Sequence, residues 1–338
     1  MDTATKLLTI LTGDRPTGPL HLGHLVGSLE ARVRLQHQHR QFVLIADAQA
    51  LTDNVADPGK IGRNILELMA DYLAVGIEPD QTAICLQSEI PALAELAFYL
   101  LNLVTVARLE RNPTVREEIR ERGFERNIPA GFLAYPVSQA ADITAFDAAL
   151  VPVGADQLPV IEQAQEIVRR CNALFGETLT MPEGLISETP RLIGIDGAGK
   201  MGKSAGNAIP LGIDADALVE AVNSMFTDPG HIRISNPGRV EGNVVFAYLE
   251  AFDPDKAEVA RLMAHYRAGG LGDVALKRRL AGILEQLLAP IRERRRQFAS
   301  DPGQLVAILK AGTEKAMEIA SQTALRLRRN MGLGFAML

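Results

Sequence analysis

The sequence predicts a parallel α/β domain followed by an all-helical domain. Apolar segments of strand length alternate with segments of helical periodicity as far as about residue 210, which is typical of a parallel sheet covered by helices. From about Ala215 onward only helical patterns remain. The Gly- and Pro-containing loops that separate these helices are expected at residues 228–243, 268–272 and 301–303.

These patterns divide the chain into three parts. We expect an α/β domain over residues 1–210 and a helical domain over residues 211–300. Residues 301–338 are expected to form a C-terminal helix that packs back on the α/β domain. The length of 338 residues is sufficient for two domains with their own cores.

Short apolar runs mark the expected strands. They lie at residues 7–12, 42–46, 83–86, 150–153 and 192–195. The helices between them are expected at residues 20–36, 61–75 and 158–174. Residues from about 91 to 126 are helical in pattern and interrupt the alternation, so we interpret residues from about 88 to 130 as a helical insertion.

The charge of the chain is unevenly distributed. Residues 261–338 hold 14 Lys and Arg against 6 Asp and Glu, although the whole chain has a net charge of −6. This basic segment favours a polyanionic partner, with solvated helix faces as the alternative. Arg292 and Arg294–Arg296 are candidates for contacts with RNA phosphates or for such a solvated face.

Composition argues against several classes of protein. No apolar run reaches membrane-spanning length, and residues 1–6 lack the pattern of a secretion signal. Cys85 and Cys171 share no short spacing, so we expect neither a disulfide framework nor a zinc site. We therefore expect a cytoplasmic protein without a membrane segment or a protein-held metal.

The first chemical motif is His21-Leu22-Gly23-His24, here called the HLGH segment. It follows a strand and a Gly/Pro turn and begins a helix, where free amides and the helix dipole attract anions. Gly18 and Gly23 let a phosphate chain and an adenine approach the backbone. The two histidines can donate to phosphate oxygens from one face. The motif predicts nucleotide binding, with capping or surface histidines as the alternative.

The second motif is Gly197–Ser204, which literally satisfies the P-loop pattern G-x-x-x-x-G-K-[ST]. A P-loop should lead directly into a helix, whereas Ala205–Pro210 is a poor helix start. We favour a different interpretation, a lysine loop over residues 197–206. In this loop Lys200 and Lys203 would reach the pyrophosphate part of ATP. A generic P-loop ATPase stays as an alternative.

A third motif lies in the helical pattern around residue 140. Tyr135, Gln139 and Asp142 share one helix face at i, i+4 and i+7. They can form a pocket for an aromatic group with a polar tip. A buried carboxylate that accepts one N–H or O–H rejects analogues without that donor. A surface helix is the alternative.

A fourth motif, Val151–Gln157, follows the strand at 150–153. The carboxyl ends of strands bind ligands in open α/β sheets. Gly154 can admit an adenosine, and Asp156 and Gln157 can bind ribose hydroxyls. Capping of the next helix by Asp156 is a compatible alternative.

These four segments, in this order, resemble the bacterial tryptophanyl-tRNA synthetases, a family of class I aminoacyl-tRNA synthetases. The resemblance extends through most of the chain and includes Pro237–Asn243 and Tyr266–Gly272 in the helical domain. It implies a Rossmann-like catalytic domain with a helical insertion, an anticodon-binding helical domain, and a homodimer. It also implies activation of L-tryptophan by ATP, with Mg²⁺ held mainly by the ATP phosphates, and transfer to tRNA(Trp).

The resemblance further implies roles for single residues. His21, His24, Lys200 and Lys203 would stabilise the phosphates during the reaction. Asp142 would accept the indole N–H, and the tryptophan pocket would also contain Tyr135, Gln139 and Gln49. The residues that would bind ATP are Arg15, Pro16, Thr17, Gly23, His24, Gly154, Ala155, Asp156, Gln157, Leu192, Lys200, Met201, Gly202, Lys203 and Ser204.

Four positions depart from the family pattern. Arg15 stands where Gln is frequent, Gln49 where His is common, Gln139 where Met is frequent, and Gly202 where Ser is usual. The chain therefore looks like a divergent branch. Gln139 and Asp142 also resemble the amino-acid pocket of tyrosyl-tRNA synthetases. Tyrosine activation, or a synthetase-like paralogue with a regulatory role, are the alternatives.

Overall fold

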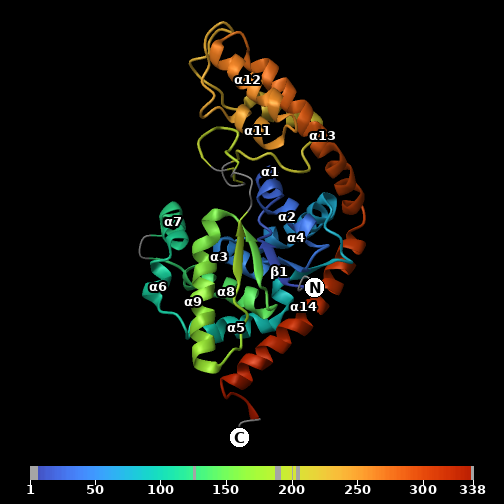
Figure 1. Ribbon diagram of the computed structural model, residues 1–338. Helices are drawn as coiled ribbons and strands as arrows, with labels where there is room; N and C mark the ends of the chain where they lie inside the picture. Colours follow the sequence, from blue (N-terminus) through green and yellow to red (C-terminus); the bar gives the residue numbers. More distant parts are fainter. Residues whose placement is uncertain (1–6, 125–126, 187–191, 200, 203–205, 336–338) are drawn as a thin grey trace, which may run out of the picture.

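The described residues form one five-stranded parallel sheet with helices on both faces (Figure 1). The computed structural model describes residues 7–124, 127–186, 192–199, 201–202 and 206–335. The strands are β1 (Thr9–Asp14), β2 (Arg40–Ile45), β3 (Thr82–Leu86), β4 (Leu150–Val153) and β5 (Glu183–Ile186). The sheet order is β3-β2-β1-β4-β5, and every neighbouring pair is parallel. The predicted α/β fold class is confirmed, and the order reverses between β1 and β4, where such sheets bind ligands.

Four of the five predicted strands occur, with ends shifted by at most two residues. The fifth prediction, residues 192–195, is wrong. Those residues pair locally, since the N–H of Met201 donates to the carbonyl of Leu192 and that of Gly194 to the carbonyl of Gly199. The fifth strand is β5, which pairs with β4 at the sheet edge. Its four residues are exposed or only half-buried, so they form no apolar run that the sequence could display.

The helix predicted at residues 20–36 is divided into three parts. They are α1 (Leu22–His24), the π-helical turn η1 (Leu25–Leu29) and α2 (Glu30–Leu35). π-Helical turns are rare and occur frequently at functional sites. The π-helical turn η1 lies directly after the HLGH segment.

Further helices connect the strands along the chain. They are α3 (Asp47–Asn54), α4 (Pro58–Val75), α5 (Pro91–Leu101), α6 (Val106–Glu110), α7 (Pro113–Arg122), α8 (Ala130–Ala145) and α9 (Leu158–Phe175), with 3₁₀ turns η2 (Gln87–Glu89) and η3 (Ala155–Gln157). The predicted insertion is helical, as expected. However, α5 buries Leu93, Leu96 and Leu100 in the same apolar cluster as α8. Helix α5 therefore belongs to the domain core, and α6 and α7 are the parts that stand away from the sheet (Figure 1).

The C-terminal part is helical, as predicted. Its helices are α10 (Ala215–Ser224), α11 (Val244–Phe252), α12 (Lys256–Ala268), α13 (Asp273–Ala299) and α14 (Pro302–Asn330). One apolar cluster contains both Val43 of β2 and Leu284 of α13, so it extends from the sheet into the helical region. Helices α13 and α14 run along one side of the molecule from the helical region to the sheet (Figure 1).

Helix α14 contacts β3 through two small residues. The hydroxyl of Thr313 accepts the N–H of Leu86 (3.0 Å) and donates to the carbonyl of Leu309 (2.7 Å). A Cβ on the neighbouring Gly312 would lie 2.0 Å from the carbonyl oxygen of Ile84, so only glycine permits this approach. The C-terminal helix is therefore packed directly on the sheet.

Two arginines near the end of α13 bind the α/β domain, and a third binds the segment before α10. Arg294 Nε donates to the carbonyl of Ala74 (2.6 Å), and Arg295 Nε donates to the Asp71 carboxylate (2.6 Å). Arg292 Nη1 donates to the carbonyl of Ile213 (2.7 Å). Arg292 is buried and Arg295 half-buried, so these two side chains form no solvated face, whereas Arg294 and Arg296 are exposed. The charge pattern alone could not indicate this, because their partners lie on distant segments.

The described residues contain no helix that is both long and apolar enough to cross a membrane. Cys85 and Cys171 are free thiols, and both are buried.

We predict that Gly312→Ala destabilises the fold by about 1–3 kcal/mol, because the new methyl group would overlap the β3 backbone. Denaturant unfolding of the full chain measures this. Gly282→Ala in α13 is the matched control, since no atom lies within 4 Å of its added Cβ. The control should gain about 0.5–1 kcal/mol because alanine favours a helix. Equal effects in both variants would contradict the close contact between α14 and β3.

Candidate active site

A cavity of about 1190 Å³ opens at the carboxyl edge of the sheet, between β1 and β4. It exceeds the roughly 300–1,000 Å³ of a typical single-ligand pocket. The predicted site residues that line it are Arg15, Thr17, His21, Gly23, His24, Gln49, Tyr135, Gln139, Asp142, Gly154, Asp156, Gln157, Leu192, Met201 and Gly202. Pro16 lies outside the lining, and Ala155 belongs to the adjacent turn η3. Lys200, Lys203 and Ser204 lie outside the described residues.

The two histidines of the HLGH segment are fixed by backbone hydrogen bonds. His21 Nδ1 accepts the N–H of Gly23 (3.1 Å), and His24 Nδ1 accepts the N–H of His21 (3.2 Å). The ring centroids are 3.9 Å apart. Because Nδ1 accepts in both rings, each neutral ring carries its proton on Nε2. This tautomer offers a donor suited to an anion.

A buried ionic cluster lies beside these histidines. The Asp14 carboxylate at the end of β1 accepts Arg32 Nη1 (2.6 Å) and the Tyr72 hydroxyl (2.7 Å). Burial alone would raise the pKa of Asp14. The charge of Arg32, with hydrogen bonds from Arg32 and Tyr72, overcomes it and holds that pKa far below its usual range. Asp14, at the carboxyl end of β1, therefore stays anionic beside the HLGH segment.

The HLGH segment also contacts the second motif. Its helix start pairs with the chain after the lysine loop: Leu22 N–H donates to the carbonyl of Ile209 (3.0 Å). The N–H of Gly23 lies 3.3 Å from the sulfur of Met201. A Cβ on Gly23 would lie 3.0 Å from the His21 ring, so a side chain there would crowd the histidine. The two motifs recognised in the sequence thus lie next to each other.

In the described residues that come next after the second motif, 206–214, no helix begins. Residues 206–214 are irregular, and α10 begins at Ala215. A P-loop needs a helix whose first amides hold the phosphates. The P-loop interpretation of Gly197–Ser204 is therefore wrong.

Helix α8 brings Tyr135, Gln139 and Asp142 to the cavity, as their spacing predicts. Asp142 is buried, and both of its oxygens accept Nε2 of Gln87, at 2.8 and 3.1 Å. Burial raises the pKa of Asp142 to about 7, and the hydrogen bond from Gln87 opposes this rise. Burial and the nearby Glu118 carboxylate also raise the pKa of Tyr135, so its hydroxyl remains neutral.

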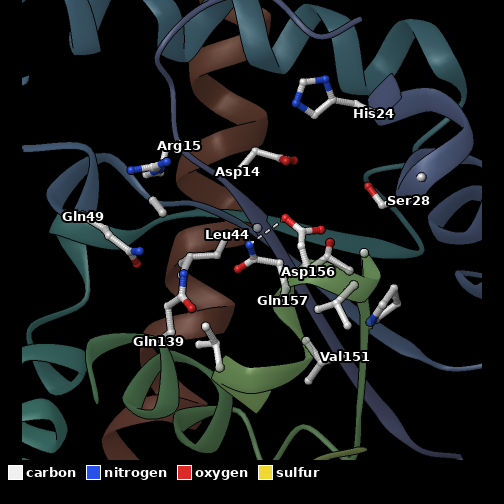
Figure 2. A pocket seen from close by; sticks show the side chains of 18 of the residues that line it. Asp14, Arg15, His24, Ser28, Leu44, Gln49, Gln139, Val151, Asp156 and Gln157 are labelled. Carbon is white, nitrogen blue, oxygen red and sulfur yellow. Dashed lines mark hydrogen bonds between the residues drawn. The ribbon is translucent and has the colours of Figure 1, made fainter. Parts of the chain in front are cut away.

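The cavity walls carry different chemistry. Figure 2 shows Arg15, Gln49 and Gln139 on one side of the cavity and His24 and Ser28 on the other. One side therefore carries two amide groups and a guanidinium group, and the other carries imidazole and hydroxyl groups.

The turn after β4 presents a carboxylate to the cavity. A Cβ on Gly154 would lie 2.8 Å from Asp156 Oδ1, so glycine makes room for this side chain. Gln157 Nε2 donates to Asp156 Oδ2 (3.2 Å), as the dashed line in Figure 2 shows. The N-cap position of helix α9 is Gln157, whose side chain forms no capping hydrogen bond, so Asp156 does not occupy that position. The hydroxyl of Thr114 on α7 donates to the Asp156 carbonyl (2.9 Å) and fixes the turn.

Sequence reasoning missed several residues of the site. Gln87 and Asp14 are the most important, followed by Arg32 and Thr114. Asp14 and Gln87 lie at the carboxyl ends of β1 and β3. Polar residues at strand ends meet at one edge of a parallel sheet, and this signal could have identified both.

Comparisons with known proteins agree with this geometry. The sequence model of the family described as "tRNA synthetases class I (W and Y)" matches residues 3–289. A tryptophan–tRNA ligase of Clostridium longisporum is 54% identical over 331 residues, covering 96% of this chain and 97% of the relative. One from Streptococcus agalactiae is 52% identical over 334 residues, covering 96% and 98%.

Solved structures show the same likeness. The tryptophanyl-tRNA synthetase of Campylobacter jejuni, complexed with ADP and tryptophan, superposes with a TM-score of 0.82 at 30% identity. The match covers 96% of this chain and all of that chain (100%). The chain therefore belongs to the class I tRNA synthetases for tryptophan and tyrosine, and within them to the bacterial tryptophanyl-tRNA synthetases.

Proposed function

We propose that this protein is a tryptophan–tRNA ligase. It activates L-tryptophan with ATP to tryptophanyl-adenylate and pyrophosphate, and then transfers tryptophan to tRNA(Trp). The observation that carries the proposal is that one cavity is lined both by the HLGH segment and by the buried acceptor Asp142. Family membership and relatives of 54% and 52% identity support the same activity.

In the first step a tryptophan carboxylate oxygen bonds to the α-phosphorus of ATP, and the bond from that phosphorus to pyrophosphate breaks. This in-line transfer needs no protein nucleophile, so catalysis consists of positioning and charge stabilisation. His21 and His24 donate to the phosphates. Lys200 and Lys203 stabilise the leaving pyrophosphate, most strongly in the transition state.

The remaining cavity residues bind the two substrates. Arg15, Thr17, Gly154, Asp156 and Gln157 surround the nucleotide, with Leu192, Met201 and Gly202 at its other side. Asp142 accepts the indole N–H, and the aromatic ring lies among Tyr135, Gln139 and Gln49.

Mg²⁺ is held mainly by ATP oxygens in this proposal. In the described part of the chain no three His, Cys, Asp or Glu side chains form a metal-binding cluster. Mg²⁺ commonly binds through substrate phosphates and keeps several waters, so the side chains present fit this arrangement. When bound, the ion would neutralise phosphate charge.

The tRNA partner and the dimer are further parts of the proposal. The helical region of residues 211–300 would bind the anticodon, supported by the exposed Ile232 and Ile234 in its loop. Exposed Phe98, Leu101 and Val106 on α5 and α6 support a homodimer surface. A tRNA substrate and free thiols both suit the cytoplasm.

We predict that ATP–pyrophosphate exchange depends on tryptophan. The kcat/KM for tryptophan should exceed that for tyrosine by at least about 10²-fold, because a pocket shaped for indole leaves the smaller ring poorly packed. Exchange that proceeds with tyrosine alone would establish the tyrosyl alternative. Tryptophan binding without exchange would favour the regulatory paralogue.

We predict that Lys203→Ala lowers kcat of exchange by about 10²–10³-fold, as expected for loss of one transition-state charge contact. The Kd for tryptophan, measured calorimetrically, should stay within about 2-fold, because this lysine acts on the pyrophosphate and not on the bound amino acid. Lys315→Ala on the exposed side of α14 is the matched control and should leave both values unchanged. A near-normal exchange rate in Lys203→Ala would remove Lys203 from the mechanism.

A further inference from the structure

The side chain of Gln87 forms a buried bridge behind the amino-acid pocket. It lies in η2, directly after β3, and is 6% exposed. Its Oε1 accepts the backbone N–H of Gln49 (2.9 Å), and its Nε2 donates to both oxygens of Asp142. Both ends of the amide are thus engaged, one with α3 and one with α8.

The orientation of this amide is determined by its partners. The N–H of Gln49 can only donate, so it requires Oε1 of Gln87. An ionised Asp142 can only accept, so it requires Nε2. Rotating the amide by half a turn would break every one of these hydrogen bonds. The side chain is therefore held in the one orientation that supports an ionised Asp142.

Asp142 has little other electrostatic support. Burial is the main influence on its pKa, and Gln87 supplies the stabilising hydrogen bond. On β3, Cys85 is close enough to interact with Asp142, and burial raises the pKa of this thiol well above neutrality. The carboxylate of Asp47 on α3 accepts hydrogen bonds from the N–H and the hydroxyl of Ser88. Tyr135 on α8 stays a neutral hydroxyl because burial raises its pKa.

We propose that Gln87 is a positioning residue for amino-acid selection: it holds Asp142 ionised and oriented so that the carboxylate accepts the indole N–H. The inference rests on the proposed function and deepens it. Gln87 contacts the substrate only through Asp142. Its effect should therefore appear in discrimination between side chains that carry an N–H and those that lack it.

The first test compares Gln87→Met with the wild-type chain. Methionine keeps a similar volume and shape, but it cannot donate to Asp142 and offers Gln49 only a weak thioether acceptor. We expect the calorimetric Kd for tryptophan to rise by about 10- to 100-fold, the range for a hydrogen bond to a charged group. The Kd for β-(3-benzothienyl)alanine, which lacks the indole N–H, should change by less than about 3-fold. The KM for ATP and kcat at saturating tryptophan should also change little.

Gln163→Met is the matched control. Gln163 is a buried glutamine of the same domain, 1% exposed on α9, and it lies outside the lining of the large cavity. This substitution should leave the preference for tryptophan over the benzothienyl analogue unchanged. If Gln163→Met altered that preference as Gln87→Met does, the effect would be general to buried glutamines, and the proposal would fail.

The pH dependence gives a second, independent readout. In the wild-type chain, tryptophan binding should weaken as pH falls through about 7, because Asp142 gains a proton. In Gln87→Met this weakening should begin at a higher pH, since the hydrogen bond that lowers the Asp142 pKa is lost. Identical profiles for the two proteins would overturn the proposal.

Gln87→Glu should make the pH dependence bell-shaped. Two carboxyl groups this close share one proton at intermediate pH, so the protonated carboxyl group introduced at position 87 can donate to Asp142 as the amide does. Binding should be strongest in that range. It should weaken at lower pH, where Asp142 is also protonated, and at higher pH, where the shared proton leaves and the two carboxylates repel each other. This variant also keeps an acceptor for the N–H of Gln49, so it tests the proposal even where Gln87→Met fails to fold. A wild-type pH profile in Gln87→Glu would contradict the role.

Two outcomes separate this inference from the proposed function. An equal loss of tryptophan and benzothienylalanine binding in Gln87→Met would show that Gln87 only supports the pocket wall, and the inference would be wrong. If the wild-type chain binds tyrosine and not tryptophan, the proposed function is wrong. In that case Gln87→Met should weaken tyrosine binding but not phenylalanine binding, so the role of Gln87 still receives a direct test.

Discussion

The antiparallel pairing of residues 20–22 with residues 209–211 is the constraint on which the site depends. Leu22 N–H donates to the carbonyl of Ile209, and Leu211 N–H donates to the carbonyl of Leu20. All four side chains are fully buried. Burial of each contributes about 1.5–3 kcal/mol, more than the roughly 0.5–1.5 kcal/mol of each hydrogen bond. Apolar packing therefore holds the segment that follows the lysine loop against the HLGH segment.

Asp71 extends this constraint to the helical region. Its carboxylate is 1% exposed; one oxygen accepts the N–H of Leu20 (2.8 Å) and the other accepts Arg295 Nε of α13 (2.6 Å). A buried carboxylate is costly without such partners. The same side chain thus fixes the residue before His21 and the arginine that joins α13 to the α/β domain. The position of the helical region is thereby linked to the geometry of the proposed nucleotide site.

Features with local patterns could be predicted from the sequence, and features that depend on distant contacts could not. The strands near residues 42 and 150 and the cavity face of α8 follow from apolar runs and helical periodicity. The edge strand β5 has no buried run, so its pairing with β4 was not visible. Gln87 acquires its role only because α3 and α8 reach it from elsewhere in the chain. The literal P-loop pattern could be set aside from the sequence itself, because Ala205–Pro210 is a poor helix start, and helix α10 begins only at Ala215.

Charging of tRNA is the most direct test of a tryptophan–tRNA ligase. The full chain is incubated with ATP, Mg²⁺, radiolabelled tryptophan and a bacterial tRNA(Trp) transcript, with tRNA(Tyr) as the control. Label should accumulate on tRNA(Trp) as an ester that mild base releases, and tRNA(Tyr) should stay unlabelled. Formation of tryptophanyl-adenylate without any transfer of label to tRNA(Trp) would contradict the assigned activity.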